Sequence, residues 1–194
     1  MGVNLLSQSG DAVHDRLDAL ADLRIRVFRD FPYLYDGDVD YEREYLEKYA
    51  ASARSVFVLA LDGDRIVGAA TGLPLVDADP AFRAPFETAG MTVDDVFYFG
   101  ESVLDPAYRG QGIGHRFFDG RERFAAEQGY TTTAFCAVVR PDDHPLRPSG
   151  YRPLASFWRA RGYAPAQGMQ TMYRWRDLGE KHETEKLMQF WLRH

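Results

Sequence analysis

Hydrophobic residues near the start of the chain recur at roughly helical spacing. They stand at Leu17, Leu20, Leu23, Val27 and Phe28. This pattern predicts an amphipathic helix within residues 11–31. A second helix is expected from Asp40 to Ala51, after the turn-prone run Asp36-Gly37-Asp38.

Two short apolar runs follow, separated by a turn. The runs are Val56 to Leu61 and Arg65 to Ala70, and Asp62-Gly63-Asp64 lies between them. An Asp-Gly pair between apolar runs is a strong signal of a β-hairpin, so two antiparallel strands are expected. Residues 74–96 are rich in Pro, Asp and Ala, and we expect a surface excursion there with one or two short helical turns.

The second half of the chain alternates between strand and helix patterns. Strands are expected at Val96 to Leu104 and Thr131 to Val139, with a helix between them from about His115 to Gln128. A strand, a helix and a strand over this distance imply a right-handed parallel crossover. The remaining elements are a Pro-rich loop at 140–153, a short helix at 154–161 and strands at 170–176 and 187–192. Since no repeat or low-complexity tract interrupts the chain, residues 1–194 are expected to form one α/β domain with a mixed sheet.

Composition and charge narrow the possible classes of function. Of the 194 residues, 45% are hydrophobic and 27% charged, and the formal net charge is -6. This balance argues against a sequence-independent nucleic-acid binder, which needs concentrated Lys and Arg. No signal peptide is recognisable, and the longest clean apolar run is far below the ~20 residues needed to span a bilayer. We therefore expect no membrane association and a cytoplasmic location.

Residue types that bind metals are sparse and scattered. Cys136 is the only cysteine, which excludes an intrachain disulfide and a Cys-rich metal site. No spacing of His, Asp and Glu supports a metal site either, and a lone His144 is weak evidence for one. No metal is expected.

A glycine-rich turn lies between the predicted strand 96–104 and the helix that follows it. Its sequence is Arg109-Gly110-Gln111-Gly112-Ile113-Gly114. A helix N-terminus carries about four unpaired N–H groups and a positive dipole end, so a turn that exposes them binds an anion. A dinucleotide fingerprint would need Gly or Ala at His115 or Phe117, and no Walker Gly-Lys-Ser/Thr follows. The alternative is that the glycines only make a tight turn.

Two segments resemble the GNAT N-acetyltransferase family. The run from Glu101 to Gly114 is similar to the family signature, in which a strand and a proline precede Arg/Gln-x-x-Gly-x-Gly/Ala at the start of a helix. The run from Ser156 to Tyr163 resembles the family's short helix with an aromatic residue and a later Gly-Phe/Tyr pair. The resemblance covers most of residues 11–192. It implies a mostly antiparallel sheet with a central, splayed parallel pair of strands, flanked by helices.

The resemblance also implies that acetyl-CoA is the co-substrate. The backbone of Val103 and Leu104 would pair with the pantetheine arm as an added strand. The turn would hold the pyrophosphate, and Trp158 would pack against the pantetheine. The implied cofactor-binding set is Val103, Leu104, Arg109, Gly110, Gln111, Gly112, Ile113, Gly114, His115 and Trp158. Gly100 is a plausible bulge residue at the place where the family's strands part.

Acetyl transfer to an amine needs a proton acceptor, an oxyanion site and a route for a proton to the thiolate. Glu101, a carboxylate in an apolar strand, is the candidate base; the alternative is that it faces away and pairs with an arginine. The tyrosine that the family commonly carries on the short helix is replaced by Trp158, which cannot donate to a thiolate. Tyr151 and Cys136 are substitutes in principle, although core packing is an alternative for both.

The acceptor would enter opposite CoA, where two segments combine aromatic and polar residues. We hypothesise that Tyr33, Tyr35, His144 and Arg147 line a pocket for a polar small molecule with an acidic group. The alternative is that the arginines solvate a helix face and the proline-rich loop caps the sheet.

The expected function is therefore an acyl-CoA-dependent N-acyltransferase, with acetyl transfer to an amine by direct attack in a ternary complex. The acceptor is a small-molecule amine or a peptide. A non-catalytic acyl-CoA-binding module is the alternative from another class. Phe190 and Trp191 either fill the core or pair across a homodimer.

Overall fold

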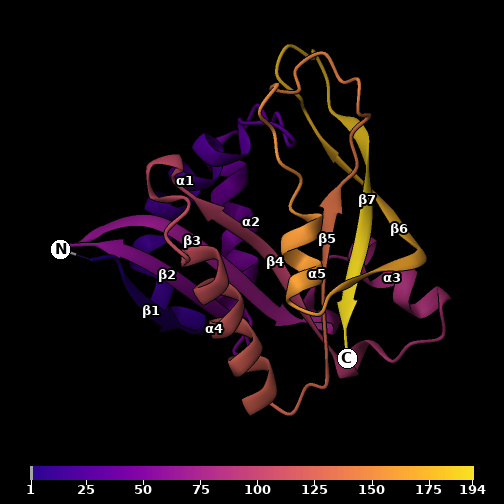
Figure 1. Cartoon of the computed structure of the whole chain (residues 1–194). Coiled ribbons are helices and arrows are strands. Elements are labelled where there is room, and N and C mark those ends of the chain that lie inside the picture. The colour runs from indigo at the N-terminus through magenta and orange to yellow at the C-terminus, as the bar shows by residue number, and fades with distance from the viewer. Residues whose placement is uncertain (1) are drawn as a thin grey trace.

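The computed structural model describes residues 2–194 as a twisted sheet with helices on both faces (Figure 1). The strands are β1 (Asn4–Gln8), β2 (Val56–Asp62), β3 (Arg65–Pro74), β4 (Val96–Leu104), β5 (Thr132–Val138), β6 (Ala164–Trp175) and β7 (Thr184–Arg193). The helices are α1 (Leu17–Phe28), α2 (Val39–Ala51), α3 (Pro80–Thr88), α4 (Ile113–Glu127) and α5 (Ala155–Ala160). Short 3-10 turns lie at Gly10–Arg16, Leu75–Asp77, Val93–Asp95 and Pro106–Tyr108.

The seven strands form one sheet in the order β1-β2-β3-β4-β5-β7-β6. Every neighbouring pair is antiparallel except β4 and β5, which are parallel. The hairpin around Gly63 and the parallel crossover through α4 are thus confirmed. The mixed sheet flanked by helices is the expected fold class.

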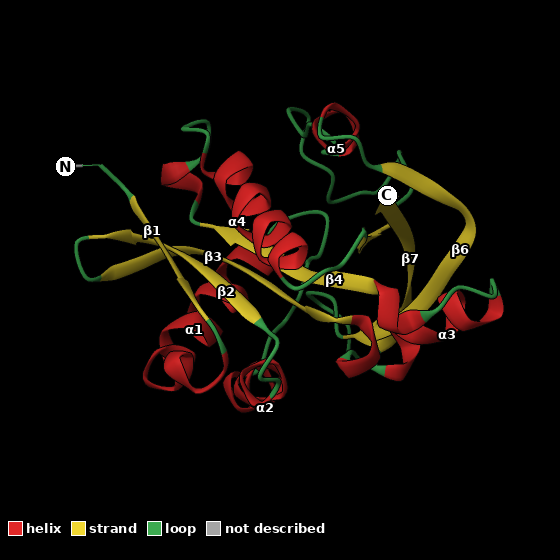
Figure 2. Ribbon diagram, turned by 90° about the horizontal axis from the view of Figure 1, so that it is seen from below, coloured by secondary structure: helices red, strands yellow, loops and turns green. Residues whose placement is uncertain are grey.

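The helices divide between the two faces of the sheet. In Figure 2, α1 and α2 lie on one face, α4 and α5 on the other, and α3 sits beside β6 at one end. Alternate strand residues fill two separate cores. Tyr98 and Val103 of β4 belong to the core under α1 and α2, whereas Phe97 and Phe99 belong to the core under α4.

Helix α4 packs closely on the sheet because it carries a glycine on its inner face. A Cβ on Gly120 would stand 3.0 Å from Val58 Cγ2, tighter than an ordinary contact, so a side chain there would require Val58 or α4 to shift. The fully buried Phe117, one turn earlier on the same face, fills the neighbouring space.

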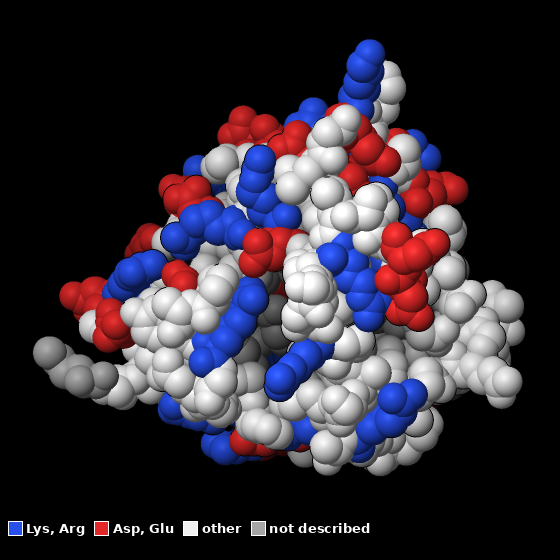
Figure 3. Space-filling view, turned by 45° about the horizontal axis from the view of Figure 1, so that its top comes forward, with Lys and Arg blue, Asp and Glu red and all other residues white. Residues whose placement is uncertain are grey.

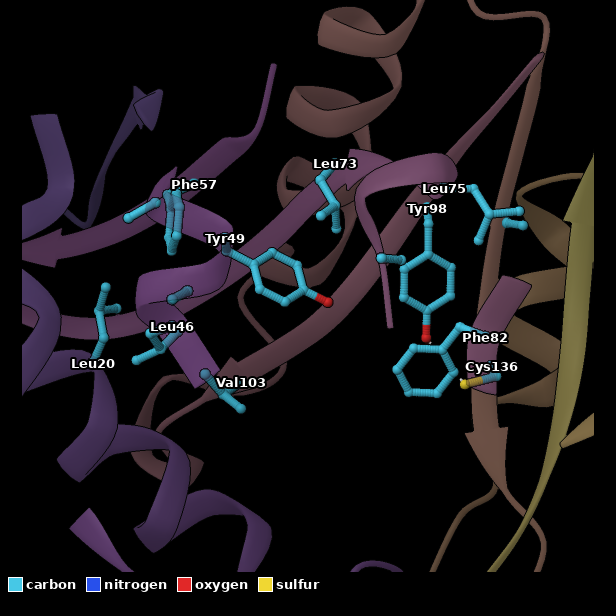
Figure 4. Close-up of a cluster of buried hydrophobic side chains, with 14 of the residues drawn as sticks. Leu20, Leu46, Tyr49, Phe57, Leu73, Leu75, Phe82, Tyr98, Val103 and Cys136 are labelled. Carbon is cyan, nitrogen blue, oxygen red and sulfur yellow. Dashed lines mark hydrogen bonds between the residues drawn. The ribbon is translucent and has the colours of Figure 1, made fainter. Parts of the chain in front are cut away.

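Two expectations about the fold are wrong, and one strand was missed. Strand β1 was not expected, because its exposed polar residues Asn4 and Ser7 are three positions apart and break the alternation of a strand. Residues 74–96 are no mere surface excursion: Phe82 and Phe86 of α3 are buried, and Phe82 stacks on Tyr98 with ring centroids 5.1 Å apart (Figure 4). Strand β6 begins at Ala164, six residues before the expected start, and its register with β7 shifts between Pro165 and Gln170.

The aromatic residues of the last strand fill the core of this chain. Phe190 is fully buried and meets Phe86 edge-on, while Trp191 lies over Phe135 and Trp158. The two alternatives for these side chains were core packing and pairing across a homodimer. Both side chains pack in the core of this chain.

Candidate functional site

The two central parallel strands are paired at one end only. Val96, Phe97 and Tyr98 of β4 face Thr132, Thr133 and Ala134 of β5, and the pairing stops there. Both strands continue, β4 to Leu104 and β5 to Val138, and Figure 1 shows them diverging. The backbone of β4 beyond Tyr98 is therefore without a strand partner on its β5 side, although β3 still pairs with its other side.

A β-bulge lies where the strands part. Ala70 of β3 pairs with Ser102 and Gly72 pairs with Phe99, so Gly100 and Glu101 together stand opposite Thr71. A Cβ on Gly100 would stand 2.7 Å from Thr71 Oγ1 and would also collide with the Tyr49 hydroxyl. The glycine is thus required by close approach, and the extra residue puts the side chains of Tyr98 and Glu101 on the same face of the sheet.

A buried arginine on α4 holds this bulge from the opposite face. Arg121 is 1% exposed, and its Nη1 donates to the carbonyl oxygens of Thr71 (3.2 Å) and Glu101 (2.9 Å). Its Nη2 donates to Ser102 Oγ at 2.8 Å, and the guanidinium lies 4.3 Å from the Phe99 ring centroid. Burial lowers the pKa of Arg121 to about 10, so the group stays charged at neutral pH.

Glu101 faces α1 and α2, where it belongs to a buried ion-pair cluster. Arg24 Nη1 lies 2.6 Å from Glu101 Oε2, and Arg24 Nε pairs with Glu42 Oε2. The Tyr45 hydroxyl donates to the same Glu101 Oε2 at 3.4 Å. Burial by itself lowers the pKa of Arg24, but the carboxylates of Glu101 and Glu42 outweigh it and hold that pKa well above its usual value. One arginine is therefore shared by two carboxylates.

This cluster forms part of the wall of a cavity of about 90 Å³. The cavity lies between α1, α2 and α3 on one side and β4 to β7 on the other. Its lining residues are Arg24, Phe28, Tyr33, Tyr35, Tyr41, Glu42, Tyr45, Phe82, Tyr98, Gly100, Glu101, Cys136, Tyr173, Arg174, Trp175 and Met188. Because Tyr41 is 44% exposed, the cavity reaches the surface beside α2.

The phenol groups around the cavity are kept neutral by burial. Burial raises the pKa of Tyr33, Tyr45 and Tyr98, so each hydroxyl can donate a hydrogen bond at any physiological pH. The Tyr98 hydroxyl lies 3.1 Å from Cys136 Sγ, and burial raises the pKa of that thiol to about 12. Cys136, which lies beside Tyr98 in Figure 4, is thus a buried thiol at neutral pH.

The segment that carries Tyr33 and Tyr35 is fixed by one arginine. Arg140, directly after β5, donates from Nε to Pro32 O and from Nη2 to Tyr33 O, both at 2.8 Å. The same guanidinium binds both oxygens of Asp177, at 2.7 and 2.9 Å. A bidentate, largely buried pair of this kind gives a rigid geometry, so this wall of the cavity is preformed.

The glycine-rich turn lies at the end of β4, next to the opening between the strands. Gly110 and Gly112 both have φ 76°, and a Cβ at either would meet nothing within 4 Å. No side chain caps the N-terminus of α4, so no capping side chain accepts from its first amides. Arg109 lies 3.7 Å from Asp30 at the end of α1, and the His115 ring packs on Phe157 at 4.8 Å between centroids.

The structure places the predicted site residues in two groups. Glu101, Tyr33 and Tyr35 line the cavity. Tyr151, His144 and Arg147 do not belong to its lining: Tyr151 and His144 pack on Phe31, and Arg147 lies over Tyr151 and pairs with Asp142. Trp158 is on the α4 face, where it contacts Phe135 and Trp191.

Several cavity residues were not expected from the sequence. The most informative are Arg24 and Glu42, which are 7% and 1% exposed. Both stand on the apolar face of a helix: Arg24 follows Leu20 by four residues, and Glu42 precedes Leu46 by four. A charged residue at helical spacing from apolar residues predicts a buried charge, and this signal would have identified both. Arg121, four residues after Phe117, shows the same pattern.

Two kinds of feature are missing from residues 2–194. No cluster of three or more His, Cys, Asp or Glu side chains could hold a metal ion. No helix within that range is long and apolar enough to cross a membrane.

Comparison with known proteins gives one family. The sequence profile of the Acetyltransferase (GNAT) family matches residues 18–148, about two thirds of the chain. Among curated proteins, none matches the sequence.

Solved structures agree with this fold over the whole chain. A ribosomal-protein-alanine N-acetyltransferase from Brucella melitensis has a TM-score of 0.61 at 14% identity and covers 97% of this chain and 98% of its own. A polyamine N-acetyltransferase from Drosophila melanogaster has a TM-score of 0.60 at 12% identity, with 98% and 100% covered. An acyl-CoA N-acyltransferase from Pseudomonas aeruginosa has a TM-score of 0.56 at 14% identity, with both chains fully covered. At these identities the likeness establishes the fold and leaves the substrate open.

Proposed function

The chain belongs to the GNAT acetyltransferase family, and from that premise we propose that it transfers an acetyl group from acetyl-CoA to a primary amine at the opening between β4 and β5. The observation that carries this proposal is the position of Glu101. It stands in the bulge where the two strands part, on the wall of a cavity that opens toward solvent on the α2 side.

The opening and the turn suit the two ends of acetyl-CoA. Beyond Tyr98, β4 has no strand partner toward β5. Asp105 N–H donates to Val67 O of the β3 side, so the Val103 N–H, two residues earlier, also faces β3. The Leu104 N–H faces the opening, where a pantetheine arm adds as a strand. The uncapped N-terminus of α4 and the space around Gly110 and Gly112 suit a pyrophosphate. On the face seen in Figure 3, basic side chains border a central hollow, which favours an anionic ligand.

Glu101 accepts the proton that the amine must lose. Both contacts of its carboxylate fall on Oε2, which Arg24 and Tyr45 hold, and this leaves Oε1 as the atom that receives the proton. The neutral amine then attacks the thioester carbon, the C–S bond breaks, and the second amine proton passes to the sulfur. Ammonium and acetyl-CoA thus give the amide, free CoA thiol and one proton released from Glu101.

Tyr98 is the phenol best placed to support departure of the thiolate. Its pKa is raised by burial, it lines the cavity, and it is the last residue of β4 that pairs with β5. Tyr151, the substitute acid expected from the sequence, packs on Phe31 away from this wall.

The experiment compares binding with turnover. Acetyl-CoA should stabilise the protein against heat, and release of free thiol should depend on the amine offered in a panel of primary amines. A non-catalytic binder, the second candidate, is favoured by the pairing of Glu101 with Arg24 and by Trp158 at the position of the family's tyrosine. Saturable stabilisation without thiol release on any amine would support the binder.

A further inference from the structure

The charged groups on the cavity wall do not balance. Arg24, Glu42 and Glu101 are the buried ones, and one guanidinium between two carboxylates leaves a net charge of about -1. The remaining charged lining residue, Arg174, has a 59% exposed side chain and lies 3.7 Å from Glu185. A buried excess of negative charge favours a cation, since it supplies the missing counter-ion.

Nearby cations outside the lining do not neutralise this excess inside the cavity. Arg140 and Lys186, which lie over Trp175, pair with Asp177 and Glu180. Arg121 lies on the opposite face of the sheet and donates to backbone carbonyls and to Ser102. It is absent from the cavity lining, and neither carboxylate of the cluster is within ion-pair distance of it. A ligand in the cavity therefore meets the carboxylates of the ion-pair cluster without meeting Arg121.

Apart from these charges, the wall is built almost entirely of aromatic rings. They are Phe28, Tyr33, Tyr35, Tyr41, Tyr45, Phe82, Tyr98, Tyr173 and Trp175. Phe82 stacks between Tyr98 and Tyr173, with centroids 5.1 and 4.9 Å away. Ring faces and edges of this kind bind a flat apolar body, and their faces attract an ammonium group.

The space limits the size of the ligand. A water-sized probe needs roughly 10–15 Å³, so a cavity of about 90 Å³ takes about six to nine non-hydrogen atoms. A phenyl ring with a two-carbon arm and one nitrogen has about nine. Beyond the ion-pair cluster, the wall is aromatic apart from Gly100, Cys136, Met188 and Arg174, so a second ammonium group has no carboxylate partner there.

We propose, on the basis of the acetyl transfer inferred above, that the acceptor is a small aromatic monoamine. Its ammonium group lies beside Glu42 and Glu101, and its ring lies among the tyrosines and Phe82. An amino acid is disfavoured because its carboxylate would meet the two buried carboxylates, and a diamine is disfavoured because its second ammonium would meet apolar rings.

The test uses probes that differ by one group. 2-Phenylethylamine is compared with phenylalanine, which adds a carboxylate, with 1,4-diaminobutane, which replaces the ring by a second amine, and with 3-phenylpropionate, which replaces the amine by an acid. Acetyl-dependent thiol release gives kcat/KM, and calorimetry with CoA present gives the Kd of each probe. We expect kcat/KM for 2-phenylethylamine to exceed that for phenylalanine and diaminobutane by at least about 100-fold, and its Kd to be lower by a similar factor.

The outcomes separate this proposal from the proposed function. If 2-phenylethylamine binds tightly at one site but no amine releases thiol, the acceptor class stands and the transferase proposal fails. If other amines release thiol while 2-phenylethylamine neither binds nor reacts, the acceptor class is overturned and the transferase stands. Equal or better activity with phenylalanine or diaminobutane, tighter binding of 3-phenylpropionate, or no binding of 2-phenylethylamine at all also overturns the acceptor class.

Variants of two cavity residues test whether the amine binds in this cavity. Glu42→Gln should raise the KM and Kd for 2-phenylethylamine at least about 10-fold and leave the Kd of CoA unchanged. Glu44→Gln, on the exposed face of the same helix, is the matched control and should change neither. If Glu42→Gln does not fold, Phe82→Ala should raise the KM for 2-phenylethylamine while leaving that for ethylamine unchanged. An unchanged KM for 2-phenylethylamine in the variant tested contradicts the proposal.

Discussion

Arg24 Nη1 lies 2.6 Å from Glu101 Oε2, so the carboxylate in the β4 bulge is both ion-paired and on the wall of the cavity. Two sequence-based interpretations of Glu101, as a base and as the partner of an arginine, are thus compatible. The pairing fixes one carboxylate oxygen and orients the other.

Replacing Glu101 by glutamine tests that role. Glu101→Gln keeps the shape and an oxygen for Arg24 but cannot accept the amine proton, so kcat should fall by about 10²–10⁴-fold. The Kd of acetyl-CoA should stay unchanged, because the backbone and turn that bind it are intact. The measurement is amine-dependent thiol release across pH 6–9, with the Kd measured on the same samples. Unchanged turnover at every pH would rule out Glu101 as the base.

Removing Arg121 tests how the bulge is held. Arg121→Met leaves the carbonyls of Thr71 and Glu101 buried without the donor that now reaches both. Each such group costs about 1–3 kcal/mol, so the free energy of unfolding should fall by about 2–6 kcal/mol in urea titrations. Arg123→Met, on the exposed face of α4, is the control and should change it by less than about 0.5 kcal/mol. Equal stability of the two variants would mean that Arg121 does not hold the bulge.

A pair of glycine variants tests the phosphate-binding turn. Gly112 and Gly90 have φ 76° and 71°, and a Cβ at either would meet nothing within 4 Å. Alanine at each should therefore cost a similar ~1–2 kcal/mol of stability. Only Gly112→Ala should weaken the binding of CoA, by about 10-fold, because only Gly112 lies in the turn that precedes α4. Pantetheine, which lacks the pyrophosphate, should bind both variants alike; equal CoA affinity in the two variants would contradict the assignment.

Alkaline pH should destabilise the protein through its buried thiol and phenols. Burial raises the pKa of Cys136 from about 9 to about 12 and also raises the pKa of Tyr33, Tyr45 and Tyr98. A raised folded-state pKa means that the contribution is complete below the unfolded pKa and is lost as pH rises toward the folded value. The urea concentration at the unfolding midpoint should thus decrease as the pH rises from 9 to 11. In the Cys136→Ala variant it should decrease less steeply. A midpoint that rises over that range would contradict the burial of these groups.

The regular elements could be predicted because they carry strong local signals. The Asp62-Gly63 turn, the strand that leads into Gly110 and the helix after Gly112 each combine periodicity with a specific turn chemistry. Strand β1 could not, since its pairing with β2 depends on a partner about fifty residues away along the chain. The burial of α3 could not be predicted for the same reason. Phe82 is covered by Tyr98 of β4 and Tyr173 of β6, which are distant in the sequence, and not by residues next to it in the chain.

The cavity was predicted only in part, because it is assembled from seven helices and strands and a loop. Tyr33 and Tyr35 could be named from an unusual local concentration of aromatic residues. His144 and Arg147 drew attention by residue type, but their loop carries them to Phe31 and Asp142 instead of the cavity wall. The partner of Glu101 lies 77 positions earlier in the sequence, on a different helix, and no local pattern joins Arg24 to it.

The most direct test of acetyl transfer follows the acetyl carbon itself. Acetyl-CoA labelled with ¹³C at the carbonyl is mixed with the protein and 2-phenylethylamine, or with the most active amine of the panel, and the label is followed by NMR and by mass spectrometry of the protein. The account predicts that the label moves from thioester to amide in step with free thiol and that no label stays on the protein. Label that remains in the thioester, or that accumulates on the protein, would contradict direct transfer at the β4–β5 opening.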